Sequence, residues 1–289
     1  MLLFFAKRLG AALTLLVAVS FVIYMLLYPA AGNIAANVLG ENATQEQVSL
    51  LNEQLGLDRP LPVQYGDWLL GAATGDLGVS YFTSQPVADM LAVRLPVTLS
   101  VVALVMVLTA LFAFAIGTYA GIRRGRLDRF LQLISTLGDA LPNFIIAIFL
   151  VTFFALQLGW FPATGYTALR DSPADWALSL TLPVAALTIS GVAAVVQQVR
   201  SATIGVLQND YIRTLRSRGL SERRIIFTSV LKNSSTNGLT ALGVQIVGIL
   251  GGAVVIEQVF ALPGLGSSPS SPLGVRTCPW SSGPSWPLS

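Results

Sequence analysis

Long apolar runs separated by shorter polar segments dominate this chain of 289 residues. Each run is about as long as, or longer than, the roughly 20 apolar residues that a helix needs to cross the hydrocarbon of a bilayer. Alternating patterns typical of membrane β-strands are absent from the sequence. We therefore predict an all-α, polytopic transmembrane helix bundle with five spans, at residues 9–27, 97–117, 130–158, 178–199 and 234–256.

Composition and the placement of charge support this prediction. Hydrophobic residues make up 54% of the chain and charged residues only 11%, against about 25% charged in soluble domains. The first run is too long for the apolar part of a signal peptide, and we expect it to remain as a span. Lysine and arginine concentrate before the first run and after the second and fourth, which predicts a cytoplasmic N-terminus.

The chain is expected to divide into an N-terminal span (1–31), an external segment (32–96), a transmembrane domain (97–266) and a Ser/Pro-rich tail (267–289). In the external segment, residues 44–55 predict a short amphipathic helix that Thr44 and Gln47 cap and Gly56 ends. Residues 64–70 are rich in aromatic side chains and are expected to lie at the membrane surface.

Residues 210–233, here called the basic segment, form the most distinctive polar stretch, DYIRTLRSRGLSERRIIFTSVLKN. Two short helices, 211–218 and 221–231, are predicted on either side of Gly219, with Ser221 capping the second. Composition alone favours an ordinary basic cytoplasmic loop. The alternative is a docking surface for a partner.

Five other polar positions stand in or near the spans. Asp139, close to Asn143, is interpreted either as a lining of a solute path or as a paired carboxylate near the interface, and the second is favoured. Gln197 and Gln198 are interpreted as the interfacial end of a span. Glu257 closes the last span, where it is either an interfacial charge or part of an outer vestibule.

The sequence offers little for catalysis by this chain itself. It has no histidine, its one cysteine is Cys278, and it lacks the G-x-x-x-x-G-K-[ST] pattern of a phosphate-binding loop. We expect no metal, no cofactor and no ATPase activity of its own. The net charge of +3 follows from the loop asymmetry and gives no reason to expect nucleic acid.

The basic segment resembles the cytoplasmic coupling segment of binding-protein-dependent ABC importer permeases, above all the dipeptide/oligopeptide/nickel family. That family has a sequence close to DYVRTARAKGLSERRV, then a stretch ending in L-R-N. Of the broader motif E-A-A-x3-G-x9-I-x-L-P only Gly219 and Leu231 match strictly. The positions that carry the resemblance here are Tyr211, Arg213, Thr214, Arg216, Gly219, Ser221, Glu222, Arg223, Leu231 and Asn233.

Further matches extend the resemblance over nearly all of residues 1–266. They are residues 55–81, residues 94–99, and residues 257–266, which follow an E-x-V-F-x-x-P-G-L-G pattern beginning at Glu257. The resemblance implies a permease subunit that moves di- or oligopeptides across a bacterial inner membrane by alternating access. Its implied partners are a second permease subunit, two ATPase subunits that carry ATP and Mg²⁺, and an external solute-binding protein.

Alternatives remain at this point. The same family includes importers of nickel and other small solutes. A standalone secondary transporter would show an internal repeat, which we do not see. An intramembrane enzyme would need paired catalytic groups within the spans, and the sequence offers no histidine and a single clear intramembrane carboxylate. Asp139, Asn143 and Glu257 are kept as candidates for lining the solute path or the outer vestibule.

The tail differs from the family pattern, which continues into a sixth span. With one choice of codons, residues 276–282 shifted by one base encode D-V-P-V-V-Q, close to a segment of the family. We therefore expect the tail to be an out-of-frame extension. A short disordered C-terminus is the alternative, and the DNA sequence beyond codon 266 distinguishes the two.

Overall fold

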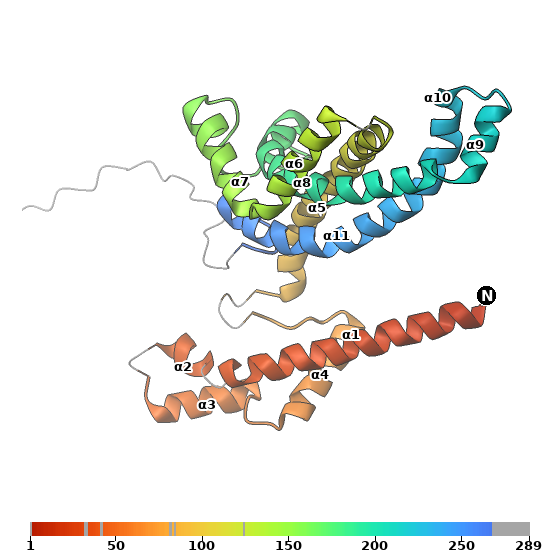
Figure 1. The fold of residues 1–289 in the computed structure, drawn as a ribbon. Coiled ribbons are helices and arrows are strands. Elements are labelled where there is room, and N and C mark those ends of the chain that lie inside the picture. Colours follow the sequence, from red (N-terminus) through yellow and green to blue (C-terminus); the bar gives the residue numbers. More distant parts are fainter. Residues whose placement is uncertain are drawn as a thin grey trace, which may run out of the picture. The chain divides into compact units, whose positions relative to one another are not determined.

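The computed structural model describes residues 2–31, 34–40, 43–80, 83, 85–123 and 125–267, and residues 268–289 of the predicted tail lie outside them. Within the described residues the regular structure is helical, apart from one isolated bridge between Val79 and Pro86. The all-α prediction is therefore confirmed. The chain divides into two compact units, Met1–Ala92 and Val93–Ser289 (Figure 1).

The first unit contains α1 (Leu2–Ala31), α2 (Ile34–Leu39), α3 (Gln45–Leu55) and α4 (Leu61–Thr74). The predicted start of α3 is confirmed, because Thr44 accepts from the Gln47 amide and the Gln47 side chain accepts from the Thr44 amide. Gly56 ends the helix in the left-handed conformation, with φ of 69°. This reciprocal capping satisfies two of the amide groups that a helix start leaves unpaired.

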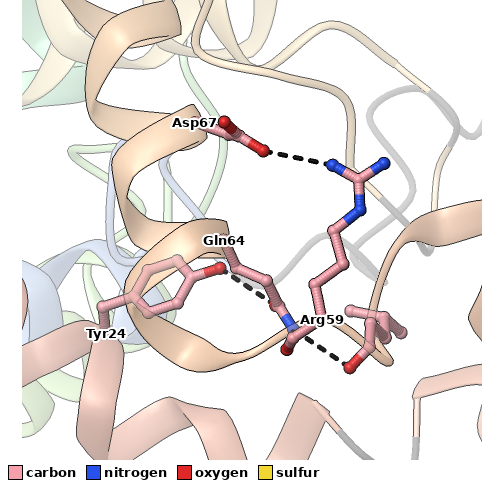
Figure 2. A network of polar contacts seen from close by, with 5 residues as sticks. Tyr24, Arg59, Gln64 and Asp67 are labelled. Carbon is pink, nitrogen blue, oxygen red and sulfur yellow. Dashed lines mark hydrogen bonds and ion pairs between the residues drawn. The ribbon is translucent and has the colours of Figure 1, made fainter.

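Helix α4 is longer than the aromatic stretch at 64–70 indicates, and it packs against α1. Tyr65 is buried, its hydroxyl donates to the Val17 carbonyl at 3.0 Å, and it lies 2.8 Å from the Ser20 hydroxyl. Tyr24 donates to Gln64, and Arg59 forms an exposed ion pair with Asp67 at 3.2 Å (Figure 2). The aromatic residues of α4 therefore serve a helix–helix contact.

The second unit is built on α5 (Val87–Ile122, which begins in the first unit), α6 (Arg126–Ala140), α7 (Asn143–Leu150), the π-helical η1 (Val151–Gln157) and α8 (Pro173–Leu207). The chain continues through α9 (Asp210–Ser217), α10 (Glu222–Ile225), the π-helical η2 (Ile226–Val230) and α11 (Leu231–Val259). Helices α8 and α11 lie side by side (Figure 1). The main core lies among α5, α7, α8 and α11.

Four helical stretches of the described residues are long and apolar enough to cross a membrane: Leu3–Leu26, Val87–Ile122, Pro173–Leu207 and Glu222–Val259. They contain the second, fourth and fifth predicted spans and all but the last residue of the first. The third predicted span is not one helix, because Asp128–Gly138 and Asn143–Gln157 meet at 98°. Pro142 forces Leu141 into an extended conformation with ψ of 126°, and this ends α6.

Small residues bring the spans of the second unit close together. A Cβ atom on Gly117 would lie 2.9 Å from the Val196 carbonyl, and one on Gly238 would meet the Phe114 ring. A Cβ atom on Gly191 would likewise lie 2.9 Å from the Thr109 hydroxyl oxygen. Close approach of backbones is the usual source of packing energy between helices in lipid, where apolar side chains gain little by leaving their surroundings.

Candidate functional site: the basic segment and the ends of the spans

The basic segment folds as a helical hairpin between α8 and α11. Helix α9 ends at Ser217, Gly219 turns the chain with φ of 76°, and α10 begins at Glu222. A positive φ is costly for residues with a Cβ atom, so this turn favours glycine. Ser221 stands at the predicted cap position but makes no side-chain capping bond, so that part of the prediction is wrong.

The second helix of the hairpin is not a separate element. Helix α10 passes through the π-helical turn η2 directly into α11, whereas the sequence indicated an end at Leu231. The part of the basic segment after Gly219 and the following span, α10, η2 and α11, are therefore one continuous helical rod. No turn separates α10 from α11.

A small apolar cluster holds the hairpin together. Ile212 of α9, Ile225 of α10 and Val230 of η2 are each at most 1% exposed, and Leu215 and Leu220 pack against them. Such a cluster fixes the two short helices against one another, since helices of this length are marginal in isolation.

Polar contacts close the hairpin from outside. Arg216 forms a two-pronged ion pair with Glu222, at 2.6 and 3.3 Å, and this hydrogen bonding raises the pKa of Arg216. Asn233 donates to the Tyr211 hydroxyl and to the Ser229 carbonyl, both at 2.9 Å. Two positions picked out by the sequence resemblance, Tyr211 and Asn233, thus meet across the hairpin.

The outer surface of the hairpin is strongly basic. Every charged residue of the basic segment is exposed, and six are cationic: Arg213, Arg216, Arg218, Arg223, Arg224 and Lys232. Arg213, Arg216 and Glu222 also line a polar hollow of about 310 Å³ with the ends of α5 and α8. Thr214 is exposed on α9, and Leu231 is partly buried. This surface is suited to an acidic or polar partner.

A second ion pair, which the sequence did not indicate, lies close to the hairpin. The Arg200 side chain of α8 donates to both carboxylate oxygens of Asp128 of α6, at 2.5 and 2.6 Å. Both side chains are largely buried. Paired arginine and carboxylate groups in this geometry are among the strongest polar contacts. The pair fastens the start of α6 to the last third of α8.

Glu257, at the far end of α11, is fully buried. One carboxylate oxygen accepts from the Thr98 hydroxyl at 2.5 Å and the other from the Gly266 amide at 2.7 Å. We call these three residues the Glu257 clamp. A Cβ atom on Gly264 would overlap the carboxylate, which explains the glycine at that place. Glu257 is thus buried inside the protein, and it fixes the loop after α11 to α5.

The remaining predicted positions are dispersed. Asp139 belongs to α6, and its side chain lies outside the described part of the structure. The Asn143 amide packs against Gly252 of α11. Gln197 donates to Thr136 of α6 at 3.4 Å, whereas Gln198 lines a polar groove with Asn237, Thr240 and Gln245 of α11. Sequence reasoning missed those α11 residues, although their spacing places them on one helix face.

Within the described residues, no group of three or more histidine, cysteine, aspartate or glutamate side chains is arranged to hold a metal ion. The fold and the hairpin instead define a multi-pass membrane protein that presents a basic helical surface at one end of its bundle.

Comparison with known proteins identifies the family. Residues 113–288 match the binding-protein-dependent transport system inner membrane component, and residues 1–102 match the N-terminal membrane component of the same systems. The chain belongs to this family of ABC importer permeases, which are multi-pass proteins of the inner membrane.

Named relatives are similar over most of their length. A putative peptide transport system permease protein of Brucella abortus (strain 2308) is 38% identical over 261 residues, covering 90% of this chain and 83% of the relative. A probable peptide ABC transporter permease protein of Sinorhizobium fredii is 36% identical over 261 residues, again covering 90% of this chain and 83% of the relative. A glutathione transport system permease of Shigella flexneri is 35% identical over 269 residues, 92% of this chain and 85% of the relative.

Proposed function

We propose that this chain is one of two membrane subunits of an ATP-driven importer for di- and oligopeptides. Relatives named for peptide and glutathione transport support the substrate class, and glutathione is itself a small peptide. The observation that carries the mechanism is the exposed basic hairpin, continuous with a spanning helix.

The basic segment is the surface through which ATP drives transport. Two separate ATPase subunits bind ATP and Mg²⁺, and this chain performs no catalysis. The arginines of the hairpin contact the ATPase subunit at its side of the membrane, where charge pairs give orientation and specificity. When the ATPase subunits close, the hairpin moves with them. Because α10, η2 and α11 form one rod, α11 reorients and opens the path to the opposite side.

The membrane orientation follows from this role. The hairpin faces the cytoplasm together with Lys7 and Arg8, in accord with the excess of basic residues expected on that side. The Glu257 clamp then lies at the outer end of the bundle. There an external solute-binding protein delivers the peptide, and a second permease subunit completes the path.

The experiment is uptake of a labelled tripeptide into vesicles that contain the complete importer and its binding protein. The double variant Arg216→Glu with Gly219→Pro breaks the ion pair and the turn, since proline cannot adopt φ of 76°. We expect ATP-dependent uptake to be lost while membrane insertion is unchanged.

Gly205→Ala is the matched control, because a Cβ atom at this helical glycine has nothing within 4 Å. It should transport like the parent chain. Undiminished uptake by the double variant would contradict the coupling role of the hairpin.

A further inference from the structure

A polar groove runs along the surface of two spanning helices. It has a volume of about 460 Å³, within the range of ~300–1,000 Å³ common for small-molecule sites. Its polar lining consists of Gln198 from α8 and Asn237, Thr240 and Gln245 from α11. The rest of its wall is small or branched apolar side chains.

The groove reaches the middle of a membrane-spanning helix. Gln245 lies 14 residues from Leu231 and 14 from Val259, the two ends of α11. From Asn237 to Gln245 the helix rises about 12 Å. The polar face therefore extends from the half of α11 nearest the basic segment to the depth at which a bilayer is most apolar.

Among the residues that the structure describes, the three amide side chains find no hydrogen-bond partner. Gln198, Asn237 and Gln245 make no side-chain hydrogen bond to any other described residue, and Gln198 and Asn237 are exposed. An amide facing hydrocarbon without a hydrogen bond is costly, and polar residues in spans usually face protein or a water-filled path. This face is therefore directed toward a polar occupant and away from lipid.

The chemistry of the lining identifies that occupant. Each amide offers two donors and one acceptor oxygen, and Thr240, whose hydroxyl donates to Thr236, keeps its oxygen free to accept. No side chain of the lining is charged. Such a surface pairs with N–H and C=O groups and is indifferent to the charge of neighbouring side chains. A larger groove of about 660 Å³ on α5, α6 and α8 is lined almost wholly by apolar residues and lacks these groups.

We propose that Gln198, Asn237 and Gln245 form a path site that hydrogen-bonds the main-chain amides of a peptide in transit. This inference rests on the proposed peptide import and adds to it the residues that recognise the peptide backbone. Because all peptides share the same main-chain amide groups, a site that hydrogen-bonds these groups can carry peptides with different side chains.

The test compares uptake of a tripeptide with that of the same tripeptide methylated at its internal amide nitrogens, in vesicles holding the complete importer. Methylation removes the donors that the groove would pair with. The variants are Gln198→Leu and the double variant Asn237→Leu with Gln245→Leu. Since the binding protein is the same throughout, a change in the ratio of the two uptake rates arises in the permease.

We expect the parent chain to favour the unmodified tripeptide, and each lost amide to lower its uptake about fivefold. The ratio of the two rates should fall toward one in the double variant. Gln197→Leu is the matched control, because the Gln197 amide donates to Thr136 outside the groove and its loss should leave the ratio unchanged.

Three results would overturn the inference. An unchanged ratio with full uptake in the variants would show that the groove does not hold peptide, while the proposed function stands. Loss of the second permease subunit on purification, with the ratio unchanged in the remaining complex, would make the groove a subunit interface. Absence of tripeptide uptake by the parent chain would instead refute the proposed function, and with it this site.

Discussion

Two glutamates lie near opposite ends of the helical rod formed by α10, η2 and α11. The Glu222 side chain is 59% exposed and pairs with Arg216 on the surface. Glu257 is fully buried and accepts hydrogen bonds from a hydroxyl and a backbone amide. The first leaves a charged surface open to a partner, and the second fastens the chain to itself. The same rod thus has an exposed, charged end and an end that is anchored by buried hydrogen bonds.

Substitutions in the Glu257 clamp should lower the free energy of unfolding more than substitutions at the exposed end of the rod. Glu257→Ala leaves the Thr98 hydroxyl and the Gly266 amide buried without an acceptor, which costs about 1–3 kcal/mol for each. We expect a loss of about 2–6 kcal/mol in the free energy of unfolding. Thermal or denaturant unfolding of the protein in detergent measures it, with exposed Val255→Ala as the control.

Glu257→Gln sharpens this prediction. Its amide oxygen can still accept from Gly266, but its NH₂ group cannot accept from Thr98, so the loss should be about half as large. Equal stability of the alanine variant and the parent chain would mean that the clamp does not hold the loop after α11.

The hairpin core should show a smaller and more local effect. Ile212→Ala removes a fully buried side chain from a cluster of three, which costs about 2 kcal/mol at the low end of the range for such changes. We expect trypsin to cleave the basic segment faster while the unfolding transition of the spans stays in place. Phe227→Ala, at a side chain that is 71% exposed, is the control. A shift of the whole transition would contradict a local role.

The two ends of the rod also show which features a single sequence can predict: those set by neighbouring residues, and not those set by contacts between distant ones. The turn at Gly219, the cap at Thr44 and the four unbroken spans depend on neighbouring residues, and local patterns were sufficient for them. The partners of Glu257 and Arg200 are not local, since Thr98 is 159 positions from Glu257 and Asp128 is 72 from Arg200. No periodicity in one sequence predicts such pairs.

Two further features were within reach of the sequence but were not inferred. Pro142 is the physical cause of the 98° break in the third predicted span, because it disfavours a helical conformation for the preceding residue. Asn237, Thr240 and Gln245 follow the spacing of one helix face. Gln198 was assigned to an interfacial end, and only its proximity to these residues revealed the groove.

Glu222→Gln tests the exposed end with the same chemical change. An ion pair at the surface contributes about 0–1 kcal/mol, and salt screens it. We expect the free energy of unfolding to fall by less than about 1 kcal/mol, and the difference from the parent chain to vanish near 1 M salt. The loss in Glu257→Gln should persist at that salt concentration, because its hydrogen bonds are shielded from solvent. If salt abolished both differences, or neither, the two ends would not differ in the way their burial indicates.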